Sequence, residues 1–132
     1  VSVGGSISDS VTLSGGFNPT GTITVKVFGP NDATCSGAAL FTDTINVTSG
    51  NGTYASPAHV ISVAGTYRFV ASYSGDANNN PVAGACNAAN ESVVVGKASP
   101  AIATRPVPSD TPGRTRSRSL RPVRASCRAA TP

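Results

Sequence analysis

The stretch that decides the fold is Gly65 to Asp76, which reads Gly-Thr-Tyr-Arg-Phe-Val-Ala-Ser-Tyr-Ser-Gly-Asp. Apolar and polar side chains alternate along most of it, a period of two that is typical of a strand with one buried and one solvent-exposed face. Gly65 opens the stretch and Ser-Gly-Asp closes it, and both favour turns. We therefore expect the central strand of the fold here, with Tyr67, Phe69 and Tyr73 on its buried face.

The same alternation recurs, in weaker form, through the first hundred residues. Its clearest further example is Thr22–Phe28, and Ser49–Gly52 reads Ser-Gly-Asn-Gly, a strong hairpin signal. No segment shows a sustained helical period. About seven short strands in roughly 100 residues predict an all-β chain, an antiparallel sandwich of the immunoglobulin type. The core is expected to contain Leu13, Val25, Tyr67, Phe69 and Tyr73.

Composition divides the chain into two parts near Pro100. The first part carries three cationic and five anionic side chains, a net charge of −2, and the second carries seven arginines and one aspartate, a net charge of +6. We therefore expect a β-sandwich domain at residues 1–100 and an Arg/Pro/Ala-rich, disordered tail at residues 101–132. No apolar run is long enough to span a membrane. Because Val1 is not an initiator methionine, we expect a fragment or a processed chain.

Three segments resemble the bacterial Ig-like domain repeats of large secreted and surface proteins. They are Leu13–Thr24, Ala64–Asp76 and Val93–Pro100, and the resemblance covers residues 1–100. It implies tandem modules outside the cell in adhesive or spacer roles, without catalytic residues or cofactors. The implied partners are neighbouring modules of the same chain and a surface protein or glycan. Antibody domains have Tyr-x-Cys where this chain has Tyr67-Arg68-Phe69, so the usual disulfide between the sheets is not expected, although Tyr67 can still form a tyrosine corner.

The cysteines lie elsewhere in the chain. Cys35 and Cys86 each occur in a loop that looks like an insertion relative to plainer members of that family, which suggests a Cys35–Cys86 disulfide and an oxidising compartment. In a plain Ig topology these two loops leave opposite ends of the sandwich. The bond therefore requires the long loop before the last strand to fold back along the sheet edge, and the alternative is two free thiols. Cys127 has no partner in either case.

Three interpretations of the tail stay open. An arginine-rich arm for nucleic acid or anionic surfaces is the least favoured, so a nucleic-acid partner is not expected. A disordered segment without a function is the second. The third is a shifted reading frame at the start of a next repeat, because one choice of codons for Ala125–Thr131 spells Gln-Leu-Ser-Gly-Gly-Tyr in another frame, similar to Leu13–Gly16.

Candidate chemistry is confined to one loop and one side chain. Asp76, Asn78, Asn79 and Asn80 imitate the start of a calcium loop, but Pro81 stands where such a loop requires glycine, so an Asx-turn is the main interpretation. We keep the alternative that the loop at residues 75–90 binds a specific carbohydrate or protein. His59 is expected to be structural rather than catalytic or metal-binding. The favoured function is a non-catalytic extracellular spacer or adhesion module.

Overall fold

A computed structural model describes residues 1–109, and within this range every regular element is a strand. The prediction of an all-β chain is confirmed. The tail from residue 110 onward lies outside the described residues, together with the disorder, the frameshift and the unpaired Cys127 expected there. Residues 100–109 are exposed and form no strand. Contacts divide the chain into Val1–Ser99 and Pro100–Pro132, close to the boundary predicted at residue 100.

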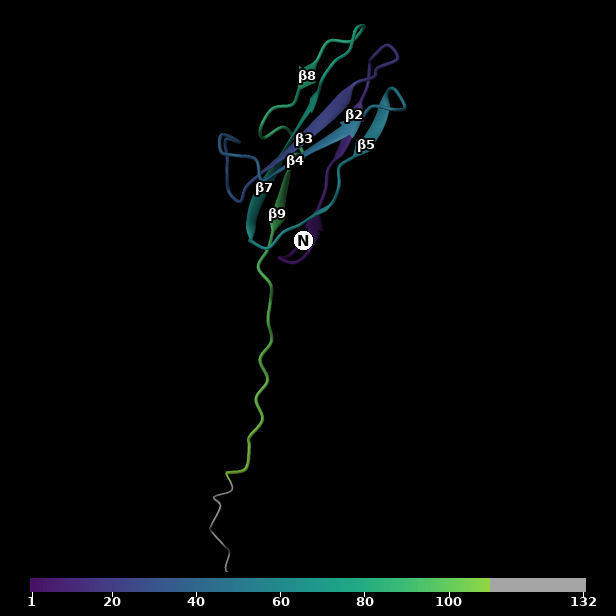
Figure 1. Cartoon of the computed structure of the whole chain (residues 1–132). Helices are drawn as coiled ribbons and strands as arrows, with labels where there is room; N and C mark the ends of the chain where they lie inside the picture. Colours follow the sequence, from purple (N-terminus) through teal and green to yellow (C-terminus); the bar gives the residue numbers. More distant parts are fainter. Residues whose placement is uncertain (110–132) are drawn as a thin grey trace, which may run out of the picture. The chain divides into compact units, whose positions relative to one another are not determined.

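The larger layer of the domain is a five-stranded sheet centred on β7 (Figure 1). On one side of β7 (Gly65–Tyr73) lie β3 (Thr22–Phe28) and then β4 (Phe41–Asn46). On its other side, β8 (Val82–Ala83) pairs with the end of β7 and β9 (Ser92–Val95) pairs with its beginning. All these pairings are antiparallel. Because β7 pairs with β3, β8 and β9, the predicted central strand holds this sheet together.

The smaller layer consists of two short ladders that follow each other along the same two chain segments. β1 (Ser6–Ile7) pairs with β6 (His59–Val60), and β2 (Ser10–Leu13) pairs with β5 (Gly52–Ala55). Pro57, which has no N–H to donate, lies in the chain between β5 and β6 and separates the β2–β5 ladder from the β1–β6 ladder. The Ser56 hydroxyl takes over one bond by accepting from the Asp9 amide at 2.9 Å, and the Ser56 amide donates to the Asp9 carbonyl. The chain thus forms nine short strands in residues 1–109, where about seven were expected.

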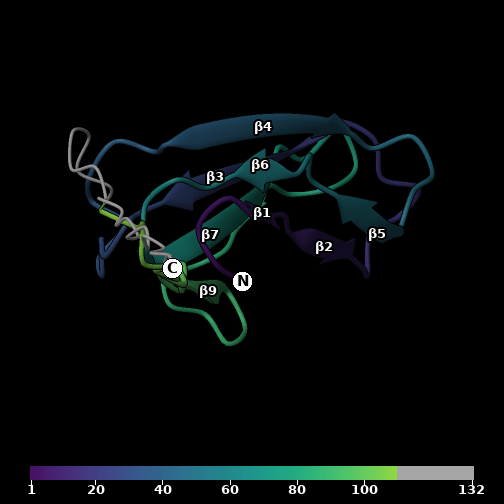
Figure 2. The ribbon, with the colours of Figure 1, turned by 90° about the horizontal axis from the view of Figure 1, so that it is seen from below.

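The two layers pack face to face and enclose one apolar core. Figure 2 shows the larger sheet running from β4 through β3 and β7 to β9. The four strands of the smaller layer, β1, β2, β5 and β6, lie together along one face of it. Tyr67, Phe69 and Tyr73 of β7 are buried, as are Leu13 of the smaller layer and Val25 of β3. Side chains from both layers complete this cluster: Ile7, Ile23, Val27, Val47, Tyr54, Ile61 and Val95.

Two further contacts fix the beginning of the chain and the corner before β7. Ser2 forms a parallel bridge with Gly96, so the first residues run beside the end of β9 and in the same direction. The Tyr67 hydroxyl donates a 2.7 Å hydrogen bond to the backbone carbonyl of Val63, four residues earlier. A buried tyrosine therefore ties the turn into β7 back to the chain that precedes it.

Candidate functional site

The candidate ligand loop connects β7 to β8, and its Asp76 carboxylate is occupied by internal hydrogen bonds. One oxygen, Oδ2, accepts from the Thr20 amide at 2.7 Å, the Thr20 hydroxyl at 3.1 Å and the Tyr73 hydroxyl at 3.0 Å. The other, Oδ1, accepts from the Asn78 amide and the Asn79 side-chain nitrogen, both at 2.8 Å. Asp76 therefore closes an Asx-turn and binds the neighbouring loop between β2 and β3.

Asn79 makes the second connection between the same two loops. Its Oδ1 accepts from the Phe17 amide at 2.8 Å and its Nδ2 donates to the Phe17 carbonyl at 3.1 Å. The Asn79 side chain thus bonds to the N–H and C=O of Phe17 as the backbone of a neighbouring strand would. We call Asp76, Asn79, Thr20 and Phe17 the loop clasp. Within the predicted ligand loop at residues 75–90, the polar side chains that are exposed and make no hydrogen bond to the described residues are those of Asn78, Asn80 and Asn90.

The surroundings of the clasp shift the pKa values of two side chains, Asp76 and Tyr73. The Thr20 and Asn78 amides hold the pKa of the Asp76 carboxyl well below its ordinary value, since each donates a hydrogen bond that favours the anion. Burial, together with the adjacent Asp76 carboxylate, raises the pKa of the Tyr73 phenol. Gly75 fits here because its φ is +73° and a Cβ would lie 2.7 Å from the Pro81 nitrogen. The arrangement is that of a structural turn, and residues 1–109 contain no group of three metal-binding side chains.

A second cluster surrounds the Cys35–Cys86 disulfide, which joins the loop after β3 to the loop before β9 across 5.9 Å between Cα atoms. After β8 the chain returns along the sheet edge, which is the path that the bond requires. Arg68, on the outer face of β7, donates from Nε to Asn87 Oδ1 at 2.5 Å and from Nη1 to the Asp32 carbonyl at 3.2 Å. The disulfide and Arg68 together hold both loops against the outer face of the larger sheet.

Asp32 organises the loop that carries Cys35. Its carboxylate accepts hydrogen bonds from the backbone amides of Gly37 at 2.9 Å and of Thr34 and Ser36, both at 3.3 Å. The Gly37 amide makes the largest contribution in lowering the pKa of this carboxyl. This carboxylate, like that of Asp76, is used to shape a loop.

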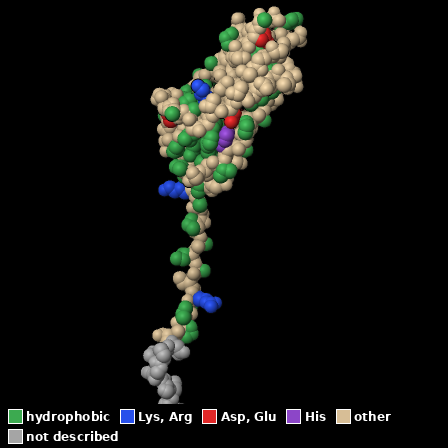
Figure 3. Space-filling model, in the orientation of Figure 1, with side chains coloured by type: hydrophobic (Ala, Val, Ile, Leu, Met, Phe, Trp, Pro, Cys, Tyr) green, Lys and Arg blue, Asp and Glu red, His purple; other side chains and the backbone are tan. Residues whose placement is uncertain are grey.

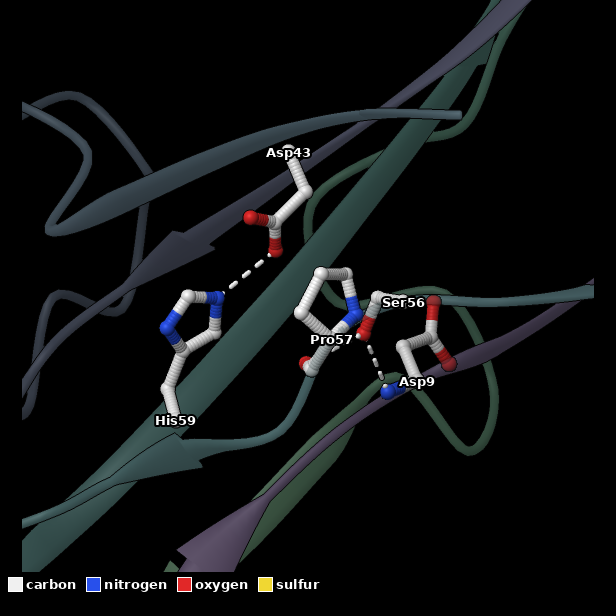
Figure 4. A network of polar contacts seen from close by, with 5 residues as sticks. All are labelled: Asp9, Asp43, Ser56, Pro57 and His59. Carbon is white, nitrogen blue, oxygen red and sulfur yellow. Dashed lines mark hydrogen bonds and ion pairs between the residues drawn. The ribbon is translucent and has the colours of Figure 1, made fainter. Parts of the chain in front are cut away.

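A third cluster joins the two layers at one side of the sandwich (Figure 4). Asp43 lies opposite Val25 in the β3–β4 ladder and so shares the inner face, and its Oδ2 is 2.7 Å from His59 Nε2 of β6. The His59 ring stacks on Phe41 with 4.0 Å between ring centroids. His59 therefore pairs with β4 through a carboxylate and through an aromatic face, which is a structural arrangement.

Among residues 1–109, no serine, threonine or cysteine hydrogen-bonds to the His59 ring, whose partner is Asp43. Ser56 is the nearest hydroxyl drawn in Figure 4, where it faces the Asp9 backbone and the Pro57 ring stands between it and His59. The Ser56 hydroxyl donates to the Pro57 carbonyl at 3.1 Å. Serine, histidine and aspartate therefore occur close together without the hydrogen bond from serine to histidine that a hydrolytic triad needs.

Two carboxylates are buried without sufficient partners on the side of the domain near β9. Asp9 Oδ2 and Glu91 Oε2 are both inaccessible and accept no hydrogen bond from the described residues. Burial raises the pKa of Glu91, and the negative charge of Asp9 raises it further. The protonated form of Glu91 is therefore favoured in the folded chain.

The remaining feature is an open pocket of about 80 Å³ between β2 of the smaller layer and β7–β8 of the larger one. We call it the edge pocket. Its walls are mostly apolar and its lining comprises Val11, Thr12, Leu13, Ile23, Ala71, Ser72, Tyr73, Val82 and Gly84. On the face that Figure 3 shows, charged side chains are few and well separated. The edge pocket is thus a small apolar recess, and the face shown carries no cluster of like charges.

The chain matches no protein-family model, no curated protein and no solved structure. No helix in residues 1–109 is long and apolar enough to cross a membrane. The edge pocket could not be expected from the sequence, because β8 is only two residues long and lies inside the stretch expected to be a loop. The available signal was Val82, the one large aliphatic residue between Tyr73 and Val93.

Proposed function

We propose that residues 1–100 are a non-catalytic, extracellular Ig-like repeat module that acts as a spacer or adhesion element of a larger bacterial surface or secreted protein. The observation that carries the proposal is the tyrosine corner, in which the Tyr67 hydroxyl donates to the Val63 carbonyl at the start of β7. This is a hallmark of Ig-like sandwiches, and Tyr67 lies at the position at which the sequence resembles such domains.

The path of the chain supports a spacer role. Since Ser2 and Gly96 pair in parallel, the chain runs in the same direction at its beginning and where it leaves β9, as is expected of modules that follow one another in line. Pro100 supports the same arrangement, because it restricts Ser99 to extended conformations.

The chemistry of the clusters supports a role without catalysis. Asp76, Asp32 and His59, the polar side chains that would be the first candidates for binding or catalysis, are each engaged in holding a loop or a layer in place. The Cys35–Cys86 disulfide supports a location in an oxidising compartment outside the cell.

The alternative is a carbohydrate- or protein-binding domain that uses the loop at residues 75–90. The exposed side chains of Asn78 and Asn80 are the observation in its favour. Glycan-array and surface pull-down assays of the full chain test both functions. The spacer or adhesion function predicts no saturable binding that depends on Asn78 and Asn80. Saturable binding that Asn78→Ala with Asn80→Ala abolishes, while the melting temperature stays unchanged, would establish the alternative instead.

A further inference from the structure

The unpaired margin of β2 is the starting point. In the ladders of the domain, β2 pairs only with β5, so along Ser10–Leu13 the backbone groups that point away from β5 have no strand beside them. Such a margin can accept an added strand, which contributes backbone hydrogen bonds while side-chain pockets select the sequence. The edge pocket lies along this margin and includes Val11, Thr12 and Leu13 in its lining.

The size of the edge pocket limits what can enter it. A cavity of about 150 Å³ accommodates a benzene molecule, so a recess of about 80 Å³ takes one aliphatic side chain rather than an aromatic ring. Because its lining is mostly apolar, a charged side chain would lose hydration there without gaining a partner.

The chain itself carries a segment with the matching properties. Residues 101–104 read Ala-Ile-Ala-Thr between Pro100 and Arg105-Pro106, and they form no strand. The Ile102 side chain is 92% exposed and stands between two alanines, so it is the one large apolar group of this stretch. Pro100 and Pro106 restrict Ser99 and Arg105, the residues that flank the segment, to extended conformations, so the chain enters and leaves it in the conformation that an added strand needs.

Charge favours an encounter between the domain of one copy and the tail of another. Residues 1–100 carry a net charge of −2, and the residues after them carry a net charge of +6. Two copies that meet through the same part of their surfaces would bring like charges together. Two copies that meet domain to tail bring opposite charges together, which favours the encounter.

From these observations we propose that the chain self-associates by strand addition: residues Ala101–Thr104 of one copy lie along β2 of a second copy, with Ile102 in its edge pocket. Two copies can exchange these segments reciprocally to form a closed dimer. The contact is small, so a dissociation constant on the order of 100 μM is expected, since interfaces of this size are weak and transient. This association does not depend on the spacer function proposed above.

Sedimentation equilibrium of the full chain, from about 10 μM to about 1 mM, measures the association. All samples carry Cys127→Ser, so that an intermolecular disulfide cannot imitate a dimer. Ile102→Asp is expected to raise the dissociation constant about tenfold or more, because it removes the burial of one aliphatic side chain. Val107→Asp is the matched control, since Val107 is 80% exposed and lies outside the proposed strand. It should leave the dissociation constant unchanged.

A complementation experiment tests the pairing of segment and pocket. Val82→Arg places a charge in the edge pocket, and Val94→Arg places one at an exposed position on β9 that is outside the pocket. Thermal melts of each variant establish that it is folded. Val82→Arg and Ile102→Asp should each be monomeric alone but form a heterodimer when mixed, because one supplies an intact segment and the other an intact pocket.

The proposal is overturned by any of three results: a wild-type chain that stays monomeric at about 1 mM, a dimer that Ile102→Asp leaves intact, or equal weakening by Ile102→Asp and Val107→Asp. Backbone amide NMR signals provide a further check. Those of Val11, Thr12 and Leu13 should shift with protein concentration in the wild type and stay constant in Ile102→Asp.

Discussion

The Tyr73 hydroxyl lies 3.0 Å from Asp76 Oδ2, three residues further along the chain, and 2.6 Å from the Thr20 carbonyl, so these two acceptors share its one proton. Tyr73 belongs to the apolar core, with an exposed fraction of 6%. One side chain therefore connects the core to the loop clasp at the end of the sandwich. The conformations of the β2–β3 loop and of the β7–β8 loop therefore both depend on Tyr73, whose ring is held by the packing of the two sheets.

Asp76→Asn is the first prediction. The anionic Asp76 carboxylate accepts from five donor groups, and the amide of asparagine offers only one oxygen to replace its two. The variant should melt at a lower temperature at pH 7. Because the pKa of Asp76 is lowered on folding, its contribution is present above the ordinary value of 3.8 and is lost as the pH falls below it. Melting curves of both proteins should therefore converge as the solution is acidified. A constant difference down to pH 2 would contradict this account.

Phe69→Ala tests the core. Phe69 is 4% exposed and faces the smaller layer from the central strand, so its truncation should cost about 3–5 kcal/mol of the free energy of unfolding. Val94→Ala on the exposed face of β9 is the control and should change stability by less than about 0.5 kcal/mol. Denaturant titration measures both, and equal effects of the two substitutions would show that the faces are assigned wrongly.

The disulfide provides the third prediction. Cys35 and Cys86 are 51 residues apart, and closing a loop of this length stabilises the folded state by about 4 kcal/mol in the chain-entropy description. The Cys35→Ser, Cys86→Ser double variant should lose up to that amount in urea titrations. As a control, thiol titration of the unfolded, unreduced wild-type chain should find one reactive sulfur, that of Cys127. Three reactive sulfurs would remove the bond.

Glu91→Gln is the fourth prediction. It should raise the melting temperature at neutral pH, whereas Asp76→Asn should lower it. Burial and the charge of Asp9 raise the pKa of Glu91 on folding, so the favourable contribution of this group is complete below its ordinary value of 4.5 and is lost as the pH rises through the folded-state value. Removing the charge should therefore raise the melting temperature at pH 7–8, by roughly 2–4 °C. Near pH 4 the variant and the wild type should melt alike. A destabilised variant at pH 8 would mean that Glu91 is paired in solution.

The strands were predictable because their pattern is local. β3 and β7 have seven and nine residues with strict alternation over most of their length, and each was located from the sequence. The buried face of each strand follows from the same period of two. β8 was missed because two residues, Val82 and Ala83, cannot display a period.

The clusters were less predictable because their members are far apart in sequence. Phe17 and Asn79 are 62 residues apart, and nothing in the sequence near either residue indicates that the two loops meet. The Asx-turn at Asp76 could be predicted because its hydrogen bonds to Asn78 and Asn79 are local. The pairing of Asp43 with His59 depends on how the layers stack, and only the structural role of His59 was anticipated.

The pairing of Asp43 with His59 also bears on how the domain avoids aggregation. β4 is a margin of the larger sheet, and a charged side chain that points inward from a margin strand discourages further chains from adding to it. Pro57 protects the β5–β6 margin in another way, because it interrupts the strand and provides no donor. β2, which reads Ser-Val-Thr-Leu, contains neither a charge nor a proline. At high local concentration, as on a crowded surface, chains would therefore stick to one another along β2 first, and a charge introduced there is the change most suited to keeping the protein dispersed.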